Sequence, residues 1–166
     1  MKLIKSSLDL ERSELFSMKM YVSAMAESKK EVERNMYFHT KVIVEHIIKA
    51  ALMPEHSARN HWFQEIATQM KEVDKLKQTK AYPTKDQIYK WTYGKRKDLV
   101  TDAGWMSATI KDLQDEYGYA PNMSQTETMT YIDKICESYF TWLSSELSQK
   151  GKVPNSEIYR KLNSLM

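Results

Sequence analysis

All four histidines of the chain lie between residues 39 and 61, which is a short stretch for side chains that can bind metals. His39 and His46 are seven residues apart and share one face of an expected helix. If the chain folds back after Pro54, His61 and Glu45 come close to His46. Imidazole nitrogens and a carboxylate oxygen are typical zinc ligands, and an open coordination position would permit hydrolysis. These four residues therefore define one hypothesis, a metal-dependent enzyme; the alternative is a set of hydrogen-bonded histidines at the edge of a helical core.

A second group of candidates lies in the basic segment, residues 71–97. It contains nine Lys or Arg residues and three acids, a local charge of +6, and aromatic residues alternate with the cations. Cations neutralise phosphates and aromatic faces stack on unpaired bases, so this composition suits nucleic acid. The predicted nucleic-acid-binding residues are Lys85, Lys90, Trp91, Tyr93, Lys95, Arg96 and Lys97. The alternative is a solvated charged helix face.

The next stretch, residues 98–146, reverses the sign. Nine acids stand against two lysines there, a local charge of −7, so the overall net charge of +3 results from cancellation. Opposite charges segregated along one chain indicate that its halves pair with each other or that copies assemble head to tail.

Other kinds of chemistry find little support in the sequence. The apolar residues at helical spacing around Cys136 indicate a buried, unreactive thiol. A single cysteine cannot form an internal disulfide, which fits a reducing compartment such as the cytoplasm. The four glycines are isolated, so no phosphate-binding loop is present and no cofactor is predicted. The polar start and the lack of a long apolar run predict a cytoplasmic chain that neither crosses a membrane nor is secreted.

The elements that must position these residues all read as helices. Four Gly and four Pro in 166 residues are too few for a turn-rich β-protein. Apolar residues spaced by threes, fours and sevens predict an amphipathic helix over residues 7–27, with Leu15, Met18 and Val22 on its apolar side. A second helix over about 29–53 and a third over 57–77 are joined by a short connection and should form an antiparallel hairpin.

The second half of the chain carries clear helix boundary signals. Thr84 with Gln87 and Ser124 with Glu127 are capping-box patterns, and Gly118 ends a helix that begins near residue 107. A last helix begins at residues 154–155. We therefore predict an all-α bundle of six or seven helices around the central hairpin, as one domain over residues 1–166 with a possible subdivision into 1–77 and 84–166.

The hairpin region resembles a bacterial helical domain family of unknown function, number twenty-nine. The similar elements are His46-Ile47-Ile48-Lys49, Pro54, and Ala58-Arg59-Asn60-His61-Trp62 running into Ile66 and Gln69. The resemblance implies a small bacterial or phage-type helical protein and no reaction.

Residues 34–70 are also similar to the helical hairpin of small terminase subunits of tailed phages. That likeness depends on Arg34-Asn35-Met36 and on Phe63, Ala67 and Met70. It implies assembly into DNA-binding rings.

The absence of a complete catalytic constellation favours a non-catalytic interaction or adaptor protein that binds a protein partner or self-assembles. Eleven methionines suit adaptable packing surfaces. The alternative functions are nucleic-acid binding through the basic segment, with DNA or RNA as partner, and the histidine-based metal enzyme.

Overall fold

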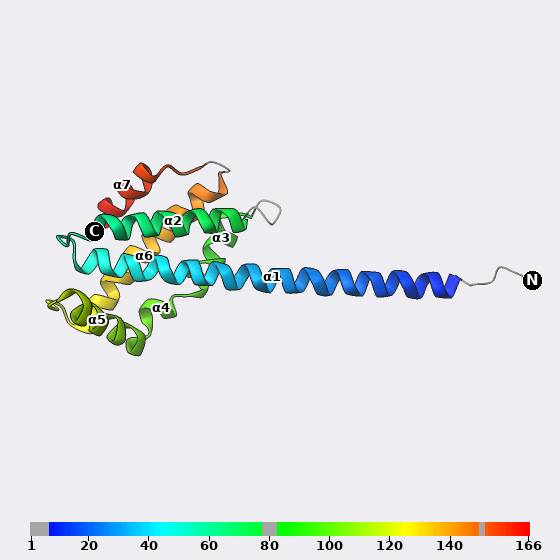
Figure 1. Cartoon of the computed structure of the whole chain (residues 1–166), viewed down its shortest axis with the longest axis horizontal. Helices are drawn as coiled ribbons and strands as arrows, with labels where there is room; N and C mark the ends of the chain where they lie inside the picture. The colour runs from blue at the N-terminus through cyan, green and yellow to red at the C-terminus, as the bar shows by residue number, and fades with distance from the viewer. Residues whose placement is uncertain (1–6, 78–82, 150–151) are drawn as a thin grey trace, which may run out of the picture. The chain divides into compact units, whose positions relative to one another are not determined.

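A computed structural model describes residues 7–77, 83–149 and 152–166, with the side chains of residues 7–12, 24–28 and 77 outside the description (Figure 1). These residues form seven α-helices and one short 3-10 helix, and no strand occurs among them. The all-α prediction is therefore confirmed.

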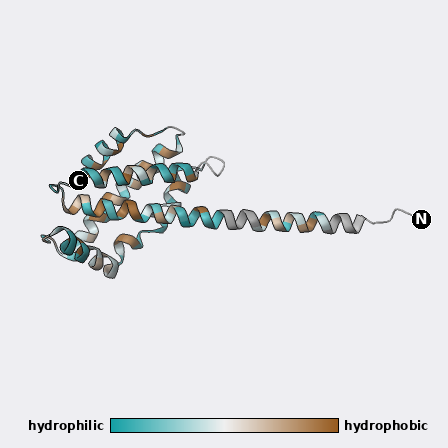
Figure 2. Cartoon of the chain, in the orientation of Figure 1, coloured by the Kyte–Doolittle hydropathy of each residue, from teal (hydrophilic) through white to brown (hydrophobic). Residues whose placement is uncertain are grey.

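The first helix, α1, runs without interruption over Ser7–Leu52, a length of 46 residues. The sequence predicted two helices here, with a boundary near residue 28. No glycine or proline stands between Ser7 and Leu52, so nothing breaks the backbone hydrogen-bond pattern until Pro54 follows the helix. Figure 2 shows hydrophobic positions at several places along α1.

The chain divides into two compact units, residues 1–34 and residues 35–166. The first unit contains the N-terminal part of α1. The second unit contains the rest of α1 and every later element. The predicted subdivision between residues 77 and 84 remains a prediction, because residues 78–82 lie outside the described part of the chain.

In the second unit, helix α2 (Arg59–Lys77) follows the short connection after α1. The two helices lie side by side in Figure 1, and a contact of 2.5 Å joins His39 Nδ1 on α1 to Gln69 Oε1 on α2. The Thr84 capping box predicted a fourth helix that begins after residue 84. The structure divides this region into α3 (Lys85–Trp91), η1 (Tyr93–Lys95) and α4 (Asp98–Thr101). Gly94 lies in η1, where a glycine weakens a continuous helix.

The three remaining helices are α5 (Ala103–Tyr117), α6 (Gln125–Ser148) and α7 (Asn155–Leu165). Both capping boxes form as predicted: Thr84 caps α3, and Ser124 caps α6. Gly118 ends α5 with a φ angle of 69°, a left-handed conformation that favours glycine.

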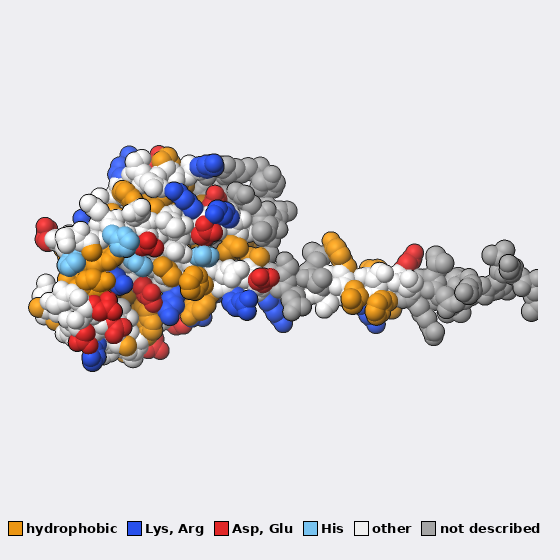
Figure 3. Space-filling model, in the orientation of Figure 1, with side chains coloured by type: hydrophobic (Ala, Val, Ile, Leu, Met, Phe, Trp, Pro, Cys, Tyr) orange, Lys and Arg blue, Asp and Glu red, His pale blue; other side chains and the backbone are white. Residues whose placement is uncertain are grey.

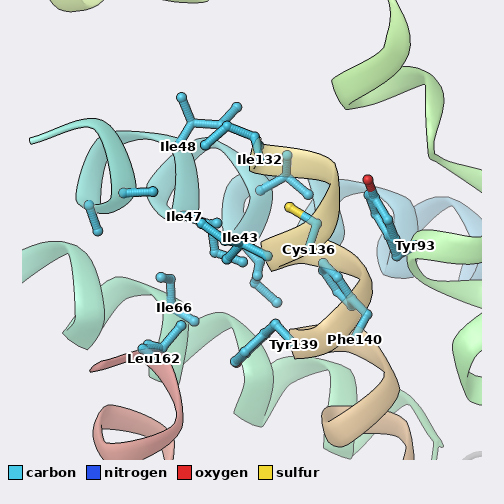
Figure 4. Packing of buried hydrophobic residues seen from close by; sticks show 14 of the residues in the cluster. Ile43, Ile47, Ile48, Ile66, Tyr93, Ile132, Cys136, Tyr139, Phe140 and Leu162 are labelled. Carbon is cyan, nitrogen blue, oxygen red and sulfur yellow. The ribbon is translucent and has the colours of Figure 1, made fainter. Parts of the chain in front are cut away.

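The core of the second unit is arranged around α6. This helix contacts α3, η1, α4, α5 and α7. Figure 4 shows α6 side chains, including Cys136 and Phe140, between isoleucines of α1 and the ring of Tyr93. The side chain of Tyr139 is fully buried, and burial raises the pKa of its hydroxyl well above the usual value. Because α3, η1 and α4 all contact α6, this helix positions the segment over residues 85–97 that carries the nucleic-acid candidates.

Candidate functional site

The nucleic-acid candidates lie on α3, η1 and the turn that follows them. Lys85 and Lys90 on α3 and Lys95 on η1 are exposed, and Trp91 is half-buried. α3 is positioned by the Thr84 cap, whose hydroxyl accepts a hydrogen bond from the Gln87 backbone at 3.3 Å. The exposed side chains of Lys85 and Lys90 can meet an external phosphate.

Tyr93 cannot stack on a base in this fold, which corrects the sequence prediction. Its side chain is fully buried, and its ring lies parallel to that of Phe140 with the centroids 5.2 Å apart. The hydroxyl donates a hydrogen bond of 2.5 Å to Asp133 Oδ1 on α6. Burial raises the pKa of Tyr93 far above its usual range, and the neighbouring Cys136 and Asp133 raise it further. Tyr93 therefore anchors its segment to α6 as a neutral phenol.

Arg96 is also held by neighbours in its own unit. Its guanidinium carbon lies 3.6 Å from the centroid of the Tyr37 ring on α1, a close cation–π contact. One guanidinium nitrogen is 3.2 Å from Asp98 Oδ2. A phosphate would therefore compete with Asp98 for the guanidinium of Arg96.

Lys97 reaches across to α6. Its Nζ lies 2.8 Å from Glu137 Oε2, and the same oxygen accepts a hydrogen bond of 2.7 Å from the Tyr89 hydroxyl. The hydrogen bond from Lys97, followed by the one from Tyr89, lowers the pKa of Glu137, while burial raises the pKa of Tyr89 to about 12. This Lys97–Glu137–Tyr89 cluster joins the basic segment to the acidic stretch, as the charge pattern suggested for paired halves of one chain.

The histidines on α1 are bound by different neighbours. His39 contacts Gln69, whereas His46 Nδ1 donates a hydrogen bond of 2.8 Å to the Val42 carbonyl oxygen one turn earlier. Burial is the main cause that lowers the pKa of His46, and the Val42 carbonyl opposes it. Glu45, whose carboxylate lies 3.7 Å from Lys41 Nζ, acts on His46 only as a nearby charge. The lowered pKa favours the neutral ring of His46, which its own helix holds through the Val42 carbonyl.

The histidines beyond the bend have other surroundings. His61 is exposed on α2. His56 lies with its ring stacked on that of Trp62, 5.1 Å between centroids, and its Nδ1 accepts a hydrogen bond of 3.1 Å from the Ala58 backbone. In the described part of the chain, no three His, Cys, Asp or Glu side chains gather so that they could hold a metal ion. The structure does not bring His39, Glu45, His46 and His61 together, and the metal enzyme remains an unsupported hypothesis.

One surface feature was only partly visible in the sequence. Residues 15–22 of α1, which we call the apolar segment, expose six large apolar side chains to 57–67%. Figure 3 shows hydrophobic side chains exposed on the visible face of this part of α1. The sequence pattern predicted one apolar side with Leu15, Met18 and Val22 but gave no indication that it is uncovered. The other three exposed residues are Phe16, Met20 and Tyr21.

A cavity of about 660 Å³ lies on the second unit, next to α2 and α7. Met70, Leu147 and Ile158 give it an apolar floor, and charged residues including Lys71 and Asp74 line its rim. Three lysines and one aspartate line the cavity, so its charged rim is predominantly positive.

Among the described residues the fold is all-α, and the apolar segment of α1 is exposed. No helix among the described residues has both the length and the apolar character needed to cross a membrane. No family model, curated protein or solved structure matches the chain. The likenesses to the family of unknown function and to small terminase subunits thus remain hypotheses.

Proposed function

We propose that this protein is a non-catalytic interaction protein and that the apolar segment of α1 is its binding element. The observation that carries the proposal is the exposure of six large apolar side chains within eight residues. Scattered single apolar residues are normal on a protein surface, whereas a contiguous group of large ones is typical of an interaction site.

The placement of these side chains around the helix supports the same function. Leu15, Met18 and Val22 are separated by three and four residues and share one face of the helix. Phe16 and Met20 are four residues apart and share another face. Helices that are apolar on more than one side are normally packed against other helices.

Covering the apolar segment would release a substantial free energy. Full burial of a large apolar side chain contributes about 1.5 to 3 kcal/mol, and roughly 60% of each of these six side chains is exposed. The gain available from each is therefore about 1 to 2 kcal/mol. The sum for six residues is comparable to the cost of association, which is about 4 to 15 kcal/mol, so a specific partner can be bound reversibly.

Site-specific photo-crosslinking in the cells that make the protein tests this function. A photo-crosslinking aromatic residue in place of Tyr21, exposed to 67%, should yield a protein adduct. The same residue in place of Phe38, exposed to 58% in the second unit, is the matched control and should yield none. The adduct should disappear when Leu15→Asp and Val22→Asp are added, since charges on the apolar face oppose burial.

Two results would contradict the proposal. One is the absence of any adduct from the Tyr21 position. The other is equal labelling from the Tyr21 and Phe38 positions, which would indicate unspecific contact.

Nucleic-acid binding remains the alternative function, carried by the exposed cations of α3 and η1. The informative variant is Lys85→Ala with Lys90→Ala, because Arg96 and Lys97 also hold the second unit together and their replacement would confound binding with stability. Nucleic-acid retardation that falls with the double variant, and with a smaller dependence on salt, would favour this alternative.

A further inference from the structure

We propose that the partner of the apolar segment is a second copy of this chain, and that the two segments form a parallel, in-register, two-stranded coiled coil. This inference depends on the proposed function, because it names the partner of the same surface. It rests on the apolar spacing of the exposed residues and on the charges beside them.

The apolar spacing matches a heptad repeat. Leu15 and Val22 occupy successive a positions and Met18 the d position between them, the arrangement that forms the seam of a coiled coil. The sequence places Met25 at the next d position and Leu8 at the preceding a position, while the d position between Leu8 and Leu15 is Glu11. Farther along the same helix, Met36 and Ile43 are also seven residues apart, and both are fully buried in the core of the second unit. The same seven-residue spacing therefore forms a buried helix-packing face at Met36 and Ile43.

The next a position after Val22 is Lys29, which is exposed. A single lysine at an a position specifies register and number of strands at some cost in stability. In a two-stranded coil its long side chain can reach water from the edge of the seam, whereas the centre of a larger bundle offers no such path. Lys29 thus favours two strands over more.

The flanking charges favour a parallel orientation. Glu14 is at a g position and Lys19 at the e position five residues later, and both are exposed. In a parallel in-register pair, g of one helix lies beside the following e of its partner, so Glu14 pairs with Lys19 of the other copy. The two-fold symmetry forms this pair twice. An antiparallel pair centred on residue 20 would keep the apolar layers but place Lys19 against Lys19.

The surface is therefore complementary to itself. A symmetric dimer requires one patch to supply both halves of each contact, and the Glu14 and Lys19 pair meets that requirement. Phe16 and Met20 fall at b and f positions, outside the seam of a two-stranded coil. They serve as internal controls in the experiment.

Two measurements on the full-length chain test the inference. Sedimentation equilibrium should show a dimer for the unaltered chain, a monomer for Leu15→Asp with Val22→Asp, and an intact dimer for the control Met20→Asp. Under mild oxidation, Leu15→Cys should form a disulfide-linked dimer, since position 15 meets itself across a parallel seam. In the antiparallel arrangement the two positions would be about 15 Å apart, from ten residues of helix rise. The unaltered chain should not cross-link, because Cys136 is fully buried.

Charge reversal provides a further control on orientation. Glu14→Lys alone and Lys19→Glu alone should each weaken the dimer by about threefold to tenfold, because two attractive pairs become repulsive, and the double variant should restore it. Tryptophan fluorescence shows whether the second unit stays folded in every variant, because Trp62, Trp91, Trp105 and Trp142 all lie in that unit.

The outcomes separate this inference from the proposed function. A monomeric unaltered chain, loss of the dimer in Met20→Asp, or a dimer in which Leu15→Cys fails to cross-link would each overturn the parallel two-stranded pair. If the chain is monomeric but the Tyr21 position captures a different protein, the proposed function stands and the second copy is wrong. If neither is found, both are wrong.

Discussion

Replacing Tyr93 provides a direct test of how the basic segment is held. The side chain is fully buried, its ring stacks on Phe140, and its hydroxyl donates to Asp133. Tyr93→Phe keeps the ring and removes only the hydrogen bond to a half-buried carboxylate, which should cost about 1 to 2 kcal/mol. Tyr93→Ala also leaves a cavity, and removal of a buried aromatic ring costs about 3 to 5 kcal/mol.

Urea unfolding followed by tryptophan fluorescence measures these differences, because all four tryptophans lie in the second unit. Tyr131→Phe on the same α6 helix is the matched control. Its side chain is half-buried and its hydroxyl makes no hydrogen bond among the described residues, so its stability should be unchanged within about 0.5 kcal/mol.

The reasoning would be refuted if Tyr93→Ala unfolded within about 1 kcal/mol of the unaltered chain. Such a result would mean that the ring does not fill the core. Tyr93 would then be free to stack on a base, and the aromatic part of the nucleic-acid hypothesis would regain its support.

Two further predictions concern charge and backbone conformation. Hydrogen bonds from Lys97 and Tyr89 lower the pKa of the Glu137 carboxyl. The ionised carboxylate therefore stabilises the fold above its unfolded pKa near 4.5, and this stabilisation is lost as the pH falls through the lower folded pKa. Lys97→Ala should lower the free energy of unfolding by at most about 1 kcal/mol at neutral pH, because the Lys97–Glu137 pair is half-exposed. Urea titrations should show this difference shrinking in acid. A difference independent of pH would contradict the ion pair. Gly118→Ala should lower the free energy of unfolding by about 1 kcal/mol, measured by thermal unfolding. The φ angle is 69° and an added Cβ would meet nothing within 4 Å, so only backbone strain is added. An unchanged melting temperature would contradict the left-handed cap.

Local signals in the sequence predicted local structure well. The Thr84 and Ser124 capping boxes and the Gly118 stop depend on residues within four positions of one another, and each forms as predicted. The division of the predicted fourth helix at η1 could not be derived in this way. Tyr93 is held there by Asp133, which is 40 residues away, and no local pattern encodes that contact.

The basic segment shows the same difference for the candidate site. Composition identified its cations and aromatic residues but not their partners. Arg96 lies over Tyr37 and Lys97 is paired with Glu137, so residues that suit phosphate binding are used partly for packing within the second unit. Lys85 and Lys90 are exposed on α3, and their contact with phosphate stays a prediction.

The apolar repeat of α1 explains why a correct pattern can still leave the function open. A seven-residue spacing specifies which face of a helix will be buried, but it does not specify what covers that face. Met36 and Ile43 are covered by the core of their own unit, whereas Leu15 and Val22 carry the same spacing and remain exposed. The charges beside the repeat add the missing information. Because Glu14 and Lys19 are spaced to satisfy each other across a two-fold axis, a second copy of the chain is the partner that this surface fits best.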